Sequence, residues 1–340
     1  MALDPQIRMT RWFRFSGLSA LLPLLLAGQA ALGQSPAPGD DAALVRELSR
    51  REAAVENLRG ELGLYHPALR EAYGELGGFY LELGDYQQSL ATYQDALEVA
   101  RINEGLHSES QLRIIDAMIA GNEGLADWQA VDSLHHFRHH MASRLWELTD
   151  SRHLSAISAF GGWKMRAIRE GLLNESAWGA QAVIDEVGAA YRRAIAALER
   201  EGGGRPLALA EMVRGKAELD LHMMGAVAST PYNYFPATVP RYVNQMRCRA
   251  VRGPNGQPVQ QCVNVQVENP RYRDSQRNNK RTTLMRYSNA INNGIERLTA
   301  IRDSGAGLPD DALAQIDSQI VQLQAQYQQY SRRGRRDFLF

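Results

Sequence analysis

The sequence predicts an all-α fold in which short helices pair and then stack as a solenoid. Small and apolar residues recur at i, i+3, i+4 and i+7 on one helical face, at Tyr73, Leu76, Gly77 and Tyr80. A second such face follows a short turn and carries Ser89, Leu90, Tyr93, Ala96 and Leu97. Related residues recur 42 positions away in both directions. Because each helix pair has more apolar surface than it buries alone, it needs neighbours on which to stack.

The turn between these two helices carries stop and start signals. Gly84 ends the first helix, and Asp85 can cap the second, with Gln88 three residues later as in a capping box. The small residues expected to let the two backbones approach closely are Gly77, Ser89 and Ala96.

The order of these residues resembles the tetratricopeptide repeat. The matching positions are Tyr73, Leu76, Gly77, Tyr80, Gly84, Tyr86, Ser89, Tyr93, Ala96 and Leu97, and only Ser89 departs from the family, which prefers alanine. The resemblance implies packing roles for Leu76, Gly77, Gly84, Ser89, Tyr93 and Ala96. It also implies a non-catalytic scaffold that binds a protein or peptide on its concave faces, where the candidate residues are Tyr73, Tyr80, Asn122, Trp128 and His135.

The repeat region is predicted to span residues 42–228, with the best repeat at 70–105. A helix at 41–58 aligns with the second helix of the best repeat, and residues 112–141 form the next unit, with Asp127 in the place of Asp85. A third unit begins near Ser151, and its second helix is expected near 177–201. Another helix follows from Pro206 to about 227. The long period of 42 residues is similar to the kinesin-light-chain type of repeat.

The first 33 residues read as a secretory signal peptide. Three arginines precede an apolar stretch at 17–27 that is too short to span a bilayer, and small residues at 31–33 form a cleavage site before Gln34. A disordered linker is expected at 34–41. The protein is therefore predicted to be exported, to the periplasm or outside a bacterial cell.

The segment after the repeats predicts a linker and then a β-hairpin. Residues 229–242 are rich in proline and tyrosine, so they form either a linker or an aromatic strap lying on the solenoid. A hairpin is expected at 243–268 around the turn residues Asn255 and Gly256. Folding the ribbon about Asn255 places Cys248 opposite Cys262, which predicts a disulfide.

Residues 280–331 predict an antiparallel, coiled-coil-like helical hairpin. The first helix runs from about Lys280 to Arg302, and the second follows Pro309 with apolar residues at alternating steps of three and four. A homo-oligomer through these C-terminal helices is the alternative. The basic and aromatic tail at 332–340 is a solvated end or a docking peptide.

The net charge of zero conceals an asymmetry along the chain. Residues 34–240 hold 19 Lys/Arg and 29 Asp/Glu, whereas residues 241–340 hold 16 and 8. The favoured interpretation is attraction between the two halves within one molecule, and the other is a basic half that meets an acidic partner. Nucleic acid is not expected as a partner of an exported chain.

A histidine run supplies the alternative function, a metal-binding envelope protein. On a helix, His135 pairs with His139 and His136 with His140 at i, i+4, a spacing that can chelate Zn²⁺, Ni²⁺ or Cu²⁺. No other cofactor is expected, and the sequence carries no phosphate-binding loop or hydrolase motif. The tryptophans at 128, 146, 163 and 178 pack between repeats or line an aromatic peptide groove.

Overall fold

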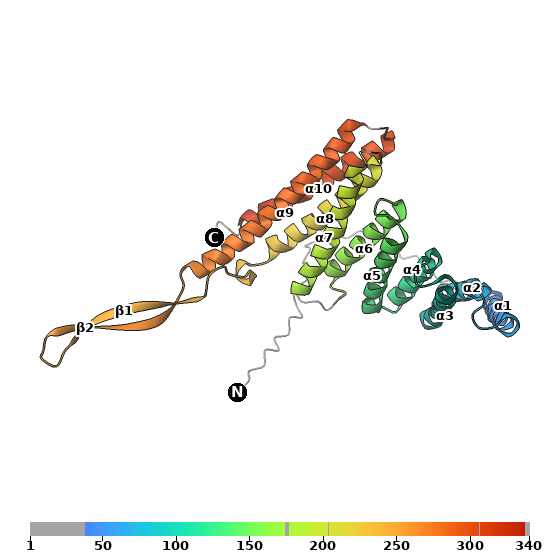
Figure 1. The fold of residues 1–340 in the computed structure, drawn as a ribbon, viewed down its shortest axis with the longest axis horizontal. Coiled ribbons are helices and arrows are strands. Elements are labelled where there is room, and N and C mark those ends of the chain that lie inside the picture. The colour runs from blue at the N-terminus through green and yellow to red at the C-terminus, as the bar shows by residue number, and fades with distance from the viewer. Residues whose placement is uncertain (1–37, 174–176, 203, 306, 337–340) are drawn as a thin grey trace, which may run out of the picture. The chain divides into compact units, whose positions relative to one another are not determined.

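The computed structural model describes the backbone of residues 38–173, 177–202, 204–305 and 307–336. The predicted signal peptide at 1–33 and the first part of the predicted linker lie outside these residues. The chain divides into two compact units, Met1–Glu47 and Leu48–Phe340. Helix α1 (Pro38–Leu62) begins inside the segment predicted as a linker and continues into the second unit. The second unit contains everything described below (Figure 1).

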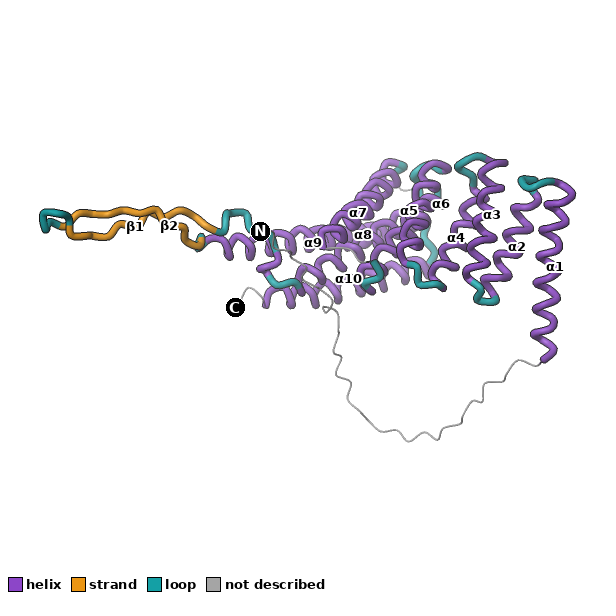
Figure 2. The backbone as a smooth tube through the Cα atoms, turned by 90° about the horizontal axis from the view of Figure 1, so that it is seen from below, coloured by secondary structure: helices purple, strands orange, loops and turns teal. Residues whose placement is uncertain are grey.

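The helices between 68 and 200 follow the predicted pairing. They are α2 (Ala68–Glu82), α3 (Tyr86–Glu104), α4 (Glu109–Gly124), α5 (Trp128–Leu145), α6 (Ser151–Glu170) and α7 (Ala177–Arg200). Each helix contacts the next one along the chain (Figure 2). Together with the hairpin described below, this stack confirms the predicted fold class, a solenoid of the tetratricopeptide-like kind.

The pair α2 and α3 shows why the small residues are needed. The Ser89 hydroxyl donates a buried 2.8 Å hydrogen bond to the backbone oxygen of Gly77. A Cβ atom at Gly77 would lie 3.1 Å from the ring of Tyr93, so only glycine leaves ordinary van der Waals space there. Ala96 is fully buried in the same cluster.

The same turn geometry recurs at the junctions α2–α3 and α4–α5. Asp85 accepts a hydrogen bond from the amide of Gln88 (3.2 Å), and Asp127 accepts one from the amide of Ala130 (3.1 Å). The residue before each aspartate has positive φ: Gly84 at 76° and Ala126 at 55°. Alanine in this region is uncommon, so the second junction keeps the turn at a conformational cost.

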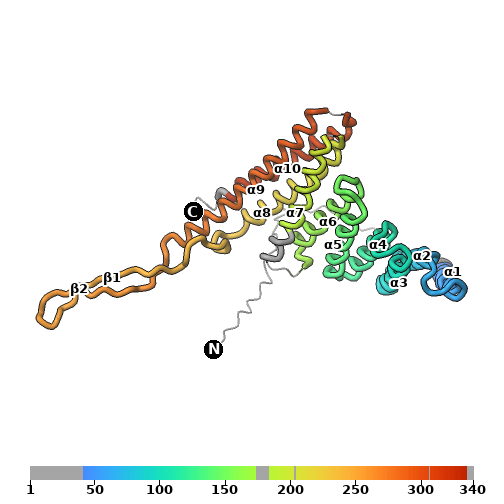
Figure 3. The backbone as a smooth tube through the Cα atoms, in the orientation of Figure 1, coloured from blue at the N-terminus to red at the C-terminus, as the bar shows by residue number. Residues whose placement is uncertain are grey.

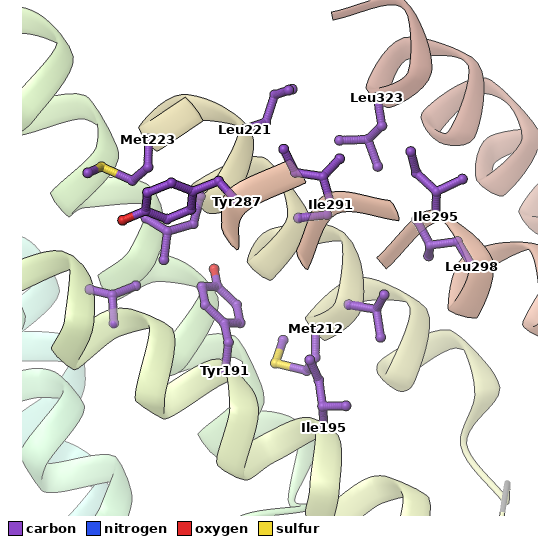
Figure 4. Close-up of a cluster of buried hydrophobic side chains, with 14 of the residues drawn as sticks. Tyr191, Ile195, Met212, Leu221, Met223, Tyr287, Ile291, Ile295, Leu298 and Leu323 are labelled. Carbon is purple, nitrogen blue, oxygen red and sulfur yellow. The ribbon is translucent and has the colours of Figure 1, made fainter. Parts of the chain in front are cut away.

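The largest apolar cluster lies where α8 (Pro206–Ser229), α9 (Arg271–Ser304) and α10 (Asp310–Arg336) pack together. Figure 4 shows Tyr191 and Ile195 of α7 converging with Met212 of α8 and Ile291 and Leu298 of α9. Helix α8 contacts both α9 and α10, so the last two helices pack on the end of the repeat region as well as on each other. Among the described helices, none combines the length and the apolar character that a membrane crossing requires.

Helix α9 begins at Arg271, nine residues before the predicted start near Lys280. The prediction was wrong because residues 271–279 are polar and carry no apolar stripe. Hydrogen bonds hold this first part instead: the Gln276 side-chain amide donates to the backbone oxygens of Asn233 (3.1 Å) and Phe235 (2.9 Å). The segment at 229–242, which includes the 3₁₀ turn η1 (Tyr232–Tyr234), therefore straps onto α9.

The predicted hairpin is present as β1 (Tyr242–Arg252) and β2 (Pro258–Glu268), which pair antiparallel (Figure 3). Cys248 lies opposite Cys262 and forms the predicted disulfide, and Val251 lies opposite Val259. The ribbon residues are exposed or half-buried along both strands. The hairpin and its disulfide are thus confirmed, and no second layer covers the ribbon within the described residues.

Candidate functional site

A buried ion pair joins α5 to α6 at the centre of the repeat region. The Asp127 cap fixes the start of α5, and Asp132 and the histidine run follow on the same helix. Lys164 of α6 has a side chain only 2% exposed, and its Nζ lies 2.5 Å from Asp132 Oδ1. The indole N–H of Trp163 donates to the same oxygen at 2.8 Å. Sequence reasoning missed this network, although Lys164 falls within the apolar spacing of α6.

Two of the four histidines stack on aromatic rings of α6. His135 lies parallel to Trp163 with ring centroids 5.1 Å apart, and His139 lies parallel to Phe160 at 5.0 Å. Burial, reinforced by Arg138, lowers the pKa of His135 to about 4. Burial, reinforced by the nearby His153, lowers the pKa of His139 to about 4 as well. Both imidazoles are therefore neutral at pH 7 and pack like aromatic side chains.

The other predicted pair is divided: His136 packs edge-on against Phe160, with ring centroids 4.8 Å apart, and lies near two acidic side chains, whereas His140 is exposed. His136 Nε2 lies 3.6 Å from Asp132 Oδ2, and its Nδ1 lies 3.8 Å from Glu186 Oε1 of α7. The ring of His140 lies 6.0 Å from that of His107. Within the described part of the chain, no group of three or more His, Cys, Asp or Glu side chains is arranged to hold a metal ion. The metal hypothesis stays a prediction that no geometry here favours.

A cleft of about 530 Å³ lies beside the histidine run. Its walls come from α5, α6 and α7 and from the loop before α6; the lining residues are His136, Phe137, His139, His140, Ser143, Leu148, His153, Ile157, Glu186, Ala190 and Arg193. We call this cleft the histidine cleft. Its chemistry is mixed, because imidazole and phenyl rings share the space with one carboxylate, Glu186, and one guanidinium group, Arg193.

A second cleft of about 690 Å³ is formed mainly by the first helices of successive pairs, α2, α4 and α6. Its walls are Arg70, Glu109, Ser110, Leu112, Arg113, Arg138, Ala142, Trp146, Ser151, Arg152, Ser155 and Ala156. Four arginines border an apolar floor, so this cleft is named the arginine groove. It follows the stacking direction of the helices and so offers room for an extended chain.

The arginines of this groove differ in whether their guanidinium groups are already paired with an acidic side chain. Arg70 pairs with Glu104, and Arg152 pairs with Asp150 and with Glu109. Arg138 Nε donates to Asp116 Oδ1 at 2.5 Å, but the buried Nη1 of Arg138 has no hydrogen-bond partner. A buried guanidinium N–H without a partner is costly, so a shift of this side chain that brings Nη1 to a ligand oxygen would be favourable.

Arg113 is the other available cation in the groove. It is exposed on α4, and none of the described residues forms an ion pair or hydrogen bond with its side chain. Trp146 adds a flat apolar wall, over which the Arg152 guanidinium stacks at 4.5 Å. Cations beside an apolar floor favour a segment that carries an acidic group next to an apolar side chain.

The structure does not bring the five predicted groove residues into one surface. Tyr73 and Asn122 are buried, and the Asn122 amide donates to the Met118 carbonyl of its own helix. The Tyr80 hydroxyl donates to Glu52 Oε1 at 2.7 Å, and burial together with this bond raises its pKa to about 12. Trp128 packs 6.3 Å from Trp163, on which His135 also stacks.

The tryptophans divide between the two interpretations that the sequence left open. Trp128 and Trp163 pack together with Arg166 lying over both rings, whereas Trp146 lines the arginine groove. The side chain of Trp178 lies outside the described residues. The groove arginines were missed because arginine on a helix usually marks a solvated face, and only stacking shows that several share one cleft.

No family model matches the sequence, and no curated protein matches it. Among solved structures, the chain is similar to nearly identical TPR-like repeats of a kinesin-light-chain type from Podosopora anserina. That match has 10% identity and a TM-score of 0.41, and it covers 54% of this chain and 81% of the other. BtubC (BKLC) from P. vanneervenii is similar at 16% identity and a TM-score of 0.38, covering 54% and 68%. At these scores we base the fold on the helix pairs themselves.

Proposed function

We propose that this protein is a non-catalytic interaction scaffold that binds a segment of another protein in the arginine groove. A solenoid of paired helices presents a continuous surface built from several repeats, which suits an extended ligand. The observation that carries the proposal is the groove itself, where Arg113 and Arg138 border a floor of Leu112, Ala142 and Ala156.

The groove chemistry defines the ligand class. Guanidinium groups bind carboxylates with two parallel hydrogen bonds, and Arg113 and Arg138 belong to neighbouring helices of one pair. An acidic side chain or a chain terminus would meet these donors, while an adjacent apolar residue would pack against Trp146. The ligand is therefore a short segment with one carboxylate beside one apolar residue.

The proposed compartment is the envelope of a bacterial cell. Disulfides persist in oxidising compartments, and Cys248–Cys262 is such a bond in an exposed ribbon. The basic and apolar pattern of residues 1–33 supports the same assignment. The ligand is accordingly sought among envelope proteins.

A crosslinked pull-down of the tagged protein from its native cell tests this function. A partner held by the groove is expected in the wild-type sample and is lost in the Arg113→Glu variant, because a carboxylate would then face the ligand's own. Arg144→Glu makes the same charge change at an exposed site of α5 outside the groove and is expected to retain the partner. Equal recovery in both variants would refute the groove as the binding site.

A further inference from the structure

Charge is concentrated in two segments of the second unit. Residues 48–127, which span the end of α1 through α4, hold 14 Asp/Glu against 6 Lys/Arg. Residues 241–286, which comprise the ribbon and the first half of α9, hold 10 Lys/Arg against 2 Asp/Glu. Nearly the whole asymmetry of the sequence therefore lies in these two segments.

One face of the ribbon is both basic and apolar. Alternation along the paired strands places Arg247 and Arg249 of β1 on this face, and its apolar members are Val243, Val251, Val259, Val263, Val265 and Val267. Val259 and Val263 are 50% and 51% exposed. Neither arginine forms an ion pair or hydrogen bond with any described residue. An isolated two-stranded ribbon with such a face is suited to docking on another surface.

A surface of matching chemistry lies at the loops before α2 and before α4. The Asn103 side-chain amide donates to the Tyr65 carbonyl at 2.8 Å and joins the last turn of α3 to the loop before α2. Around this bond the apolar side chains are 47–70% exposed, and they are Leu62, Leu64, Tyr65, Ile102 and Leu106. Glu61 directly precedes Leu62 in the sequence, and Glu98 lies one turn before Ile102 on α3. These residues form the acidic loop patch.

The two surfaces do not meet within one chain. In Figures 1 and 2 the ribbon extends beyond the start of α9, whereas α2 and α3 lie on the other side of the intervening helices. The sequence favoured an attraction between the acidic and the basic half of one molecule. The structure does not form such a contact between these two described segments. The two surfaces carry opposite charge, and both expose apolar side chains. A second copy of the chain can therefore supply the surface that each one complements.

We propose that the protein self-associates head to tail, with the ribbon of one copy docked on the acidic loop patch of the next. Such a contact joins two different surfaces, so it leaves one of each free and can extend to further copies. A symmetric ribbon-to-ribbon dimer is disfavoured, because it would bring the Arg247 and Arg249 pairs of both copies together. The contact uses neither the arginine groove nor its ligand.

Sedimentation velocity of the purified full chain, oxidised and at 100 µM, tests this proposal in about 50 mM and 500 mM NaCl. Association is expected at low salt and is weakened at least tenfold at high salt, because exposed charges are screened over about 10 Å at 0.1 M. The ribbon variant Arg247→Glu/Arg249→Glu and the patch variant Glu61→Arg/Glu98→Arg are each expected to remain monomeric. An equimolar mixture of the two is expected to associate again, because the unaltered ribbon of the patch variant can dock on the unaltered patch of the ribbon variant.

The control variant Arg144→Glu/Arg333→Glu changes the net charge as the ribbon variant does, at exposed sites outside both surfaces, and is expected to associate like the wild type. Unchanged helix content by circular dichroism excludes misfolding. A wild-type monomer at low salt, or a ribbon variant that associates normally, would overturn the proposal. The proposal would also be overturned if the protein stayed monomeric and bound vesicles of anionic phospholipid through Arg247 and Arg249. The ribbon would then be a membrane contact.

Discussion

Asp132 of α5 and Lys164 of α6 form a buried salt bridge, with 2.5 Å between Oδ1 and Nζ. The pair lies beneath the histidine run, and Trp163 adds a third hydrogen-bonded group to the same carboxylate. Both charges have left water, so their mutual attraction and the indole hydrogen bond offset a large desolvation cost. This relationship fixes how α5 sits on α6, and thereby the shape of both clefts.

Removing one member of this pair is expected to be severe. Lys164→Met leaves the buried Asp132 carboxylate without its cation, with the Trp163 indole and the nearby His136 ring as its remaining polar neighbours, and we expect a loss of about 3–5 kcal/mol in the free energy of unfolding. The double variant Asp132→Leu/Lys164→Met should recover most of this loss. Urea unfolding followed by circular dichroism measures both. As control, Asp116→Ala breaks the more exposed pair with Arg138 and should cost under about 1 kcal/mol. Equal losses in the control and in Lys164→Met would contradict the account.

Stability is expected to fall in acid because of His135 and His139. Their pKa values are about 4 in the folded protein, below the ordinary value of 6.5. The unfolded chain therefore binds protons first, and stability declines as the pH falls from about 6.5 toward 4. Allowing for partial exposure, each imidazole should contribute roughly 1–2 kcal/mol to this decline.

The double variant His135→Gln/His139→Gln isolates this effect in urea titrations at pH 7.5 and pH 4.5. The difference in unfolding free energy between the two pH values should be smaller in the variant than in the wild type. His66→Gln replaces an exposed histidine and should retain the wild-type difference. If the double variant keeps the full pH dependence, the stacked imidazoles are not its source.

Two glycines of α2 are expected to respond oppositely to alanine. A Cβ at Gly74 meets nothing within 4 Å, so Gly74→Ala should stabilise the protein by about 0.5–1 kcal/mol through helix propensity. A Cβ at Gly77 would lie 3.1 Å from the buried Tyr93 ring, so Gly77→Ala should lose that gain and destabilise by about 1 kcal/mol. Thermal unfolding distinguishes them. A rise in Tm for both variants would show that α2 and α3 are less tightly packed than described.

The disulfide is expected to stabilise the ribbon but not the helical part of the protein. Cys248 and Cys262 close a loop with a sequence separation of 14, which corresponds to about 3 kcal/mol of loop entropy. In Cys248→Ser/Cys262→Ser, amide hydrogens of β1 and β2 should exchange markedly faster. The main helical unfolding transition should shift by under about 0.5 kcal/mol, because no described layer packs on the ribbon faces. A large drop in the helical transition would reveal a coupling that the structure lacks.

The sequence predicted local features well where chemistry is local. The Asp85 cap, the small residues of α2 and α3 and the register of Cys248 with Cys262 depend on neighbouring positions or on one turn. Residues 271–279 of α9 escaped prediction because their helix is held by hydrogen bonds to the strap, more than 35 residues away. The pattern of apolar residues along a helix does not predict hydrogen bonds to a distant segment.

The candidate site was harder to predict because it depends on which helices become neighbours. The i, i+4 spacing places His135 and His139 on one helical face, but their α6 partners, Trp163 and Phe160, could not be paired with them from spacing alone. The arginine groove collects side chains from α2, α4, α5 and α6. Each of its arginines, taken singly, has the pattern of a solvated helix face.

The central claim is that the arginine groove holds a protein segment, and site-specific photocrosslinking tests it most directly. A photoreactive amino acid would replace Ser155 within the groove or, as control, Gln87 on the exposed side of α3, in the protein expressed in its native cell. The account predicts one dominant crosslinked protein from position 155 and none from position 87, with the product lost in Arg113→Glu. Absence of any crosslink from position 155, or the same product from both positions, would contradict it.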